Sequence, residues 1–118
     1  TMMIGTTTES STLTVNGGIA ASATSVSAAY TVTTGTFAVY ASAAGANVTI
    51  TLPVAGSAKG KTVLVKKSDG GVSSVLVAKA GGSADSIEGV ATVTLATQYA
   101  GVFLHNDGLN TWYKVSSL

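Results

Sequence analysis

The feature that most constrains the fold of this chain is an alternation of apolar and polar residues. The clearest case is the segment NVTITL at residues 47–52. Its Val48, Ile50 and Leu52 fall on one side and its two threonines on the other. A period of two residues is typical of a half-buried β-strand, because successive side chains of a strand point to opposite faces. This pattern predicts strands as the main element of the fold.

The same alternation recurs along the chain, and runs of glycine, asparagine, aspartate and serine separate the segments that carry it. Valine, threonine and aromatic residues favour strands because branched and flat side chains pack on a pleated surface. Strand-like segments follow one another about every 8–12 residues, the spacing of an all-β sandwich or barrel. We therefore expect an all-β fold, an antiparallel β-sandwich or a barrel-like module of hairpins. The segments are 12–15, 30–34, 36–41, 62–67, 74–78, 92–95, 101–105 and 111–115.

Composition divides the chain near residue 45. We expect residues 1–45 to form an N-terminal arm or extended β segment used for docking or oligomerisation. We expect residues 46–118 to form a compact antiparallel β domain. Residues 19–30 are rich in alanine, which favours helices, but their serines and threonines disfavour a helix interior. No helix is therefore expected there.

Two segments, VLV at 63–65 and VLV at 75–77, are apolar on both faces. Strands of this kind need a cover on each side. A second sheet or a neighbouring subunit must supply that cover.

The low charge of the chain excludes one class of partner and favours another. Charged residues are 9% of the 118 residues, and six lysines against five acids give a net charge of +1. Nucleic-acid binding needs clustered lysine and arginine, and the chain has no arginine. A nearly uncharged surface offers little repulsion between copies. We expect self-association, no nucleic-acid partner and, since no long apolar run is present, no membrane partner.

His105 is the only histidine, and the sequence HND at 105–107 suggests an active site or a metal site. A Ser–His–Asp triad would have to use it, but the chain contains no G-x-S-x-G elbow. The segment reads more simply as a hairpin with strands at 101–105 and 111–115, in which Asp107 and Gly108 form the turn. Trp112 or Tyr113 would then be a large core anchor. We expect no enzyme activity and no catalytic, metal or cofactor-binding residues.

The segment GSAKGKT at 56–62 resembles a phosphate-binding loop, but its glycines are separated by three residues rather than four. It also leads into a strand, whereas phosphate binding needs a helix N-terminus. A hairpin loop is the better interpretation.

The remaining charged side chains are expected to have structural roles. Aspartates beside glycine or serine cap their own turns by accepting from nearby backbone amides. Lysines at strand ends protect sheet edges against aggregation. These expectations apply to the acids Asp69, Asp85, Glu88 and Asp107 and to the lysines Lys59, Lys61, Lys66 and Lys67.

From about residue 47 the chain resembles a β-rich module of tailed-bacteriophage virion proteins. The resemblance lies in the order of several short motifs: VTITLP, GKTVLVKKSDGG, and then ADSIEGVATVTLATQYAGVFLHNDGLNTWYKV. It covers roughly 70 of the 118 residues. The chain departs from the usual SDG of the closing hairpin by placing Asn106 before Asp107. The family positions that match are Asp85, Ile87, Gly89, Gln98, Tyr99, Asp107, Gly108 and Trp112.

The resemblance implies a structural role without catalysis, usually as a homotrimer, in decoration proteins, head fibres, tail fibres or tail spikes. We expect a capsid decoration or head-fibre protein on the surface of the phage particle. Its partners would be itself and other virion proteins, such as the major capsid protein. The apolar Met2, Met3 and Ile4 would belong to the contact with the particle or with another subunit.

A tail-fibre or tail-spike module for host attachment is the alternative. Residues 11–22 resemble the shaft-like stretches that precede fibre tips. Thr1 is a residue that can follow removal of an initiator methionine, and on that interpretation the chain would be short for a receptor-binding fibre. The expected size therefore favours decoration.

Overall fold

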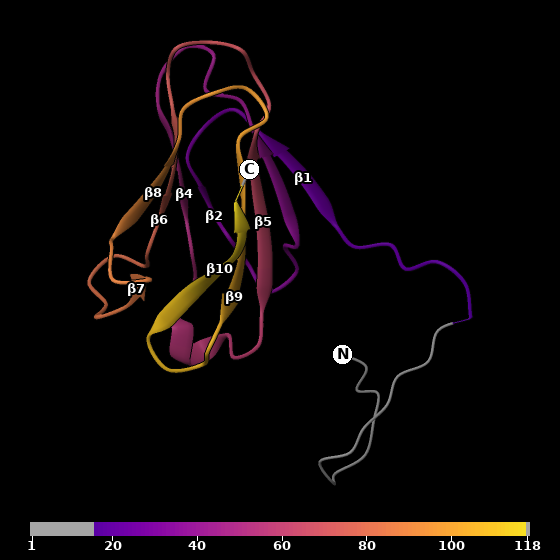
Figure 1. The fold of residues 1–118 in the computed structure, drawn as a ribbon, viewed down its shortest axis with the longest axis vertical. Coiled ribbons are helices and arrows are strands. Elements are labelled where there is room, and N and C mark those ends of the chain that lie inside the picture. The colour runs from indigo at the N-terminus through magenta and orange to yellow at the C-terminus, as the bar shows by residue number, and fades with distance from the viewer. Residues whose placement is uncertain (1–15, 118) are drawn as a thin grey trace, which may run out of the picture.

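The computed structural model describes residues 16–117 and consists of two β-sheets packed face to face (Figure 1). The all-β class expected from the sequence is confirmed. Sheet A holds, in spatial order, β1 (Ala23–Val26), β3 (Ala38–Ala41), β5 (Thr62–Lys67), β9 (Gly101–Asn106), β10 (Thr111–Ser117) and β7 (Ser86–Ile87). Sheet B holds β2 (Tyr30–Thr31), β4 (Val48–Thr51), β6 (Val75–Ala78) and β8 (Thr92–Leu95). A single 3₁₀ turn, η1 (Ala55–Ser57), lies between β4 and β5.

The strand directions differ from the expected antiparallel arrangement, because both sheets are mixed. From β1 to β6 the chain alternates between the sheets, so it winds as a flattened coil, which we call the coil (residues 23–78). Successive turns place β1, β3 and β5 parallel in sheet A, and β2, β4 and β6 parallel in sheet B. Each connection crosses to the opposite sheet instead of reversing beside its own strand, and this crossing produces parallel neighbours.

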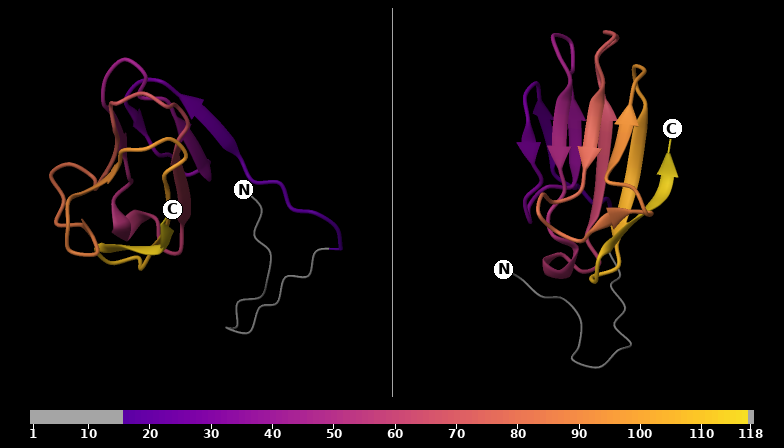
Figure 2. Two further views of the ribbon diagram at one scale, coloured as in Figure 1. Left: turned by 45° about the horizontal axis from the view of Figure 1, so that its top comes forward. Right: turned by 90° about the vertical axis from the view of Figure 1, so that its left-hand side faces the viewer.

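Antiparallel pairing begins only after the coil. β8 pairs with β6, β9 pairs with β5, and β9 and β10 form a hairpin. The right-hand view of Figure 2 shows the strands running along the long direction of the domain. The coil is therefore finished on one side by strands of the opposite direction.

The core lies between the sheets and is built mainly from valine and alanine. The alternation in β5 points Val63 and Val65 inward, and β6 does the same with Val75 and Val77. The middle leucines of both VLV segments are half-buried on the outer faces. The second sheet therefore covers one face of each strand, as expected. Trp112, from β10, is fully buried and is the largest side chain in this core.

Residues before position 45 are part of the same core. β1, β2 and β3 lie in the two sheets, and Val32, Val39 and Ala41 pack in the shared cluster. The expected division at residue 45 thus does not coincide with a break in the packing. Residues 19–30, where no helix was expected, contain β1 and the start of β2. No helix within residues 16–117 is long and apolar enough to cross a membrane.

Candidate subunit-contact surface

The HND segment closes the β9–β10 hairpin, as the sequence predicted. The Oδ1 atom of Asp107 accepts hydrogen bonds from the backbone N–H of Leu109 (2.7 Å), Asn110 (3.1 Å) and Thr111 (3.1 Å). These bonds, that of Leu109 foremost, lower the pKa of Asp107. Gly108 follows with φ +80°, a conformation that glycine adopts readily. The carboxylate therefore stabilises a turn.

His105 is exposed on the outer face of sheet A, between Thr62 of β5 and Tyr113 of β10. Asp107 is occupied by its own turn, so the two residues do not form a catalytic pair. Within residues 16–117, no three His, Asp or Glu side chains come together in a way that could hold a metal ion. The GSAKGKT segment forms η1 and a turn before β5, and no long helix follows it.

Lys67 and Asp69 form a largely buried polar centre that was not predicted from the sequence. The Nζ atom of Lys67 is fully buried and lies 2.8 Å from Oδ2 of Asp69. It also donates to the backbone carbonyls of Asp69 (2.8 Å) and Gly71 (3.1 Å). The expectation that Lys67 protects a sheet edge is wrong. The alternation in β5 could have indicated this burial, because Lys67 falls on the same inward side of the strand as Val63 and Val65.

The carboxylate of Asp69 links two loops of the coil. It accepts hydrogen bonds from the N–H of Ala43 (2.7 Å), after β3, and of Gly71 (2.9 Å), after β5. Lys67, followed by these backbone donors, lowers the pKa of Asp69 to about 2. A side chain added at Gly71 would come within 2.9 Å of this carboxylate, so a glycine is needed there. The centre fastens neighbouring turns of the coil to each other.

A second polar centre lies around η1. The N–H of Ala55 donates to Oδ2 of Asp85 (2.8 Å), and the amide of Asn106 donates to the carbonyl of Ala55 (3.1 Å). Glu88 accepts from the N–H of Lys114 (2.7 Å). The expectation that each acid caps its own turn is thus wrong for Asp85 and Glu88, which bind distant backbone.

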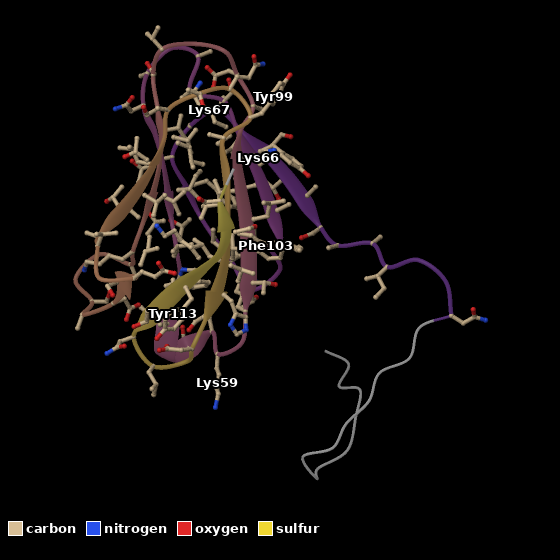
Figure 3. All side chains as sticks on the ribbon, in the orientation of Figure 1. Lys59, Lys66, Lys67, Tyr99, Phe103 and Tyr113 are labelled. Atoms are coloured by element: carbon tan, nitrogen blue, oxygen red, sulfur yellow. The ribbon has the colours of Figure 1, made fainter. Side chains whose placement is uncertain are left out.

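The lysines do not gather into one basic patch. Lys59 and Lys67 lie near opposite ends of the domain (Figure 3). Lys61 donates to the carbonyls of Thr34 (3.2 Å) and Thr36 (2.7 Å), and its partial burial lowers its pKa. The stem of Lys66 packs over Gly101 on the outer face of sheet A. Lys61 and Lys66 thus make separate local contacts.

The outer face of sheet A carries a group of apolar side chains outside the core. We call it the aromatic face. Alternation directs Leu64 and Phe103 outward in register on β5 and β9, away from the buried Val63, Val65, Val102 and Leu104. Phe103 contacts Phe37 edge-to-face, with ring centres 5.9 Å apart. The face consists of Phe37, Tyr40, Leu64, Phe103 and Tyr113.

Exposure makes the aromatic face a candidate for contact with a protein. Tyr40 and Tyr113 are 37% and 50% exposed, and the other three members are half-buried. Aromatic residues are enriched in protein–protein interfaces because they bury a large area with few rotatable bonds. The labelled Phe103 and Tyr113 belong to adjacent strands of this sheet (Figure 3).

The outer face of sheet B is different. Thr49, Leu76 and Thr94 lie side by side in register on β4, β6 and β8. The neighbouring row contains Thr51, Ala78 and Thr92. These are ordinary solvent-facing strand residues with no aromatic member. The two faces therefore differ in their capacity to bury area against a partner.

Several positions that carry the family resemblance are structural. Ile87 and Trp112 are fully buried and lie opposite each other in the β7–β10 pair. Gly89 has φ +88° in the turn after β7.

Met2, Met3 and Ile4, the expected contact residues, lie outside the described residues. A hollow of 280 Å³ is lined by residues 27–28, 42 and 44–48 and has no charged group in its lining.

No family model, curated protein or solved structure matches this chain.

Proposed function

We propose that this chain is a non-enzymatic structural protein of a tailed-bacteriophage particle, most simply a capsid decoration or head-fibre protein that assembles as a trimer. The observation that carries the proposal is the aromatic face of sheet A. It places two exposed tyrosines, two phenylalanines and a leucine on one surface of a domain with very few charges.

The chemistry of the charged residues supports a structural role. The four acids of the described residues bind backbone amides, and one of them also neutralises a buried lysine. Groups engaged in this way hold loops in place. The order of motifs that resembles phage virion modules supports the particle as the site of action. Other virion proteins, such as the major capsid protein, are the partners that this proposal implies.

The first experiment measures assembly through the aromatic face. Light scattering at micromolar concentration should give a trimer for the natural chain and a smaller species for the double variant Phe103→Ser, Tyr113→Ser. Leu76→Ser is the matched control, since it removes a half-buried apolar side chain from the outer face of sheet B. A natural chain that is monomeric, or a double variant that stays trimeric, contradicts this use of the face.

The second experiment locates the chain on the particle. Density for it over the capsid shell in images of the phage supports decoration. A module of a tail fibre or tail spike is the second candidate, favoured by the shaft-like sequence of residues 11–22. Density on the tail, together with binding of the isolated chain to intact host cells, would replace the decoration proposal with this one.

A further inference from the structure

The edge of sheet A formed by β1 has free hydrogen-bonding groups. Within residues 16–117, no strand pairs with its outer side. On its inner side, the carbonyls of Ser22 and Val26 accept from the N–H of Ala38 (3.0 Å) and Ser42 (2.9 Å) beside β3. Alternate residues of a parallel strand bind the same neighbour, so the N–H and C=O of Ala23 and Ser25 point to the free side.

This edge lacks the devices that usually protect sheet edges. Proteins block exposed edges with lysine, proline, bulges or very short strands. β1 has the sequence ATSV, and its pairing with β3 is continuous over four residues. At the other side of the domain, β7 is only two residues long and contacts β8, and Val90 pairs back onto Ile87. Sheet A is therefore covered at its β7 edge and open at its β1 edge.

An exposed segment without secondary structure lies directly before β1. Residues 16–21, which we call the arm, are all exposed, and Ile19 is 79% exposed. The arm runs away from both sheets (Figure 1). The residue after the arm is Ser22. Its hydroxyl donates to the carbonyl of Gly35 (2.6 Å) and accepts from the N–H of Phe37 (3.0 Å). These bonds fix the point at which the arm leaves the domain.

The arm cannot lie parallel to the β1 strand that it leads into. Two parallel strands of one chain need a connection of about a dozen residues, and the arm joins β1 without one. The arm of a second copy has no such restriction. It is uncharged, it exposes an isoleucine, and strand addition to an open edge gains backbone hydrogen bonds along its length.

We propose that the free edge of β1 binds the arm of a second copy of this chain as an added strand, so that neighbouring subunits are linked by strand exchange. The proposal deepens the proposed function and rests on it, because it names a contact through which the assembly forms. Exchange of one element between identical subunits is a low-cost route to oligomers, since each copy supplies both the donor and the acceptor.

Two variants of the full chain separate donor from acceptor. Ser25→Pro removes a backbone N–H that faces the free edge, while the bonds of Ser22 and Val26 to the β3 side remain. Ile19→Asp places a charge on the arm. Each variant should weaken self-association at least about tenfold, measured as the apparent Kd by light scattering over a dilution series. Ser25→Ala and Val72→Asp are the controls, since the first keeps the N–H and the second charges a fully exposed valine elsewhere.

Mixing the two variants tests exchange between chains. Ser25→Pro still has an intact arm, and Ile19→Asp still has an intact edge, so the mixture should form a complex of one copy of each. Formation of this mixed complex supports strand exchange. Its absence from the mixture contradicts strand exchange. Ile19 lies outside both sheets, so its variant remains informative if Ser25→Pro proves unfolded.

The outcomes distinguish this inference from the proposed function. If Ser25→Pro and Ile19→Asp form assemblies of the same mass as the natural chain, strand exchange is overturned. Assembly through the aromatic face is unaffected by that result. A natural chain that is monomeric throughout the dilution series overturns both.

Discussion

The coil of residues 23–78 and the β9–β10 hairpin are stabilised in different ways. The hairpin joins two strands that are adjacent in sequence, and one carboxylate organises its turn. The coil joins strands that are distant in sequence, and a buried lysine–aspartate pair fastens its loops. Local hydrogen bonds suffice where the chain reverses on itself. Where it crosses between sheets, a bridge between loops is needed.

The largest expected effect tests whether the hairpin also supports the coil. Trp112 is fully buried between the sheets, so Trp112→Ala should cost about 3–5 kcal/mol of unfolding free energy. Urea unfolding followed by circular dichroism measures it. Trp112→Phe should cost less, because it keeps most of the ring and removes an N–H that has no hydrogen-bond partner within residues 16–117. Equal losses for the two variants would contradict an anchor that acts through packing.

The next effect concerns the bridge between loops. Asp69→Asn leaves the ammonium group of Lys67 buried without a counter-ion, and removing one partner of a buried pair is strongly destabilising. The Tm should fall clearly, by less than in Trp112→Ala. The double variant Lys67→Met, Asp69→Asn should recover part of the loss, because no charge is then left in the core. A double variant less stable than Asp69→Asn would show that the pair is not coupled.

Acid should loosen the coil through the same carboxylate. The pKa of Asp69 is about 2 in the fold, against an ordinary value of 3.8. Because the folded value is the lower one, the stabilising effect is complete above about pH 4 and is lost as the pH falls from about 4 toward 2. Thermal melts of the natural chain should therefore show a falling Tm over this window. In Asp69→Asn the Tm should depend less on pH over this window. An unchanged dependence of Tm on pH would show that other groups cause it.

The smallest effect is expected in the hairpin turn. Asp107→Ala removes the acceptor of three backbone N–H groups, but these lie at the surface, where water can replace it. The Tm should fall less than in Asp69→Asn. Hydrogen exchange should increase at residues 109–111 and remain unchanged in β3 and β5. Faster exchange throughout the coil would break the proposed division between the two regions.

The hairpin could be predicted from sequence because its determinants are local. Asp107 and Gly108 indicated the turn, and the alternating residues on either side indicated the strands. The sequence limited the large core anchor to Trp112 or Tyr113 but could not choose between them; Trp112 is fully buried, whereas Tyr113 is 50% exposed. Strand positions in general followed from alternation. β1 was missed because its sequence ATSV has little apolar contrast, and β7 was missed because it is only two residues long.

The winding of the coil could not be predicted in the same way. Val39 pairs with Val65 in register, but loops of unequal length separate the successive turns, so no sequence repeat marks the pairing. Alternation says which face of a strand is buried and not which strand lies beside it. The aromatic face depends on this pairing, since it brings together residues from β3, β5, β9 and β10. It therefore became visible only in three dimensions.

The late position of Trp112 in the chain has a consequence for biosynthesis. A ribosome releases β1 to β6 well before β9 and β10, yet the core lacks its largest side chain until residue 112 has emerged. Contacts between residues far apart in sequence also form slowly. Until β9 and β10 emerge, the inward valines of the nascent coil lack part of their cover. Premature termination within the last strands would release an aggregation-prone fragment rather than a shorter working domain.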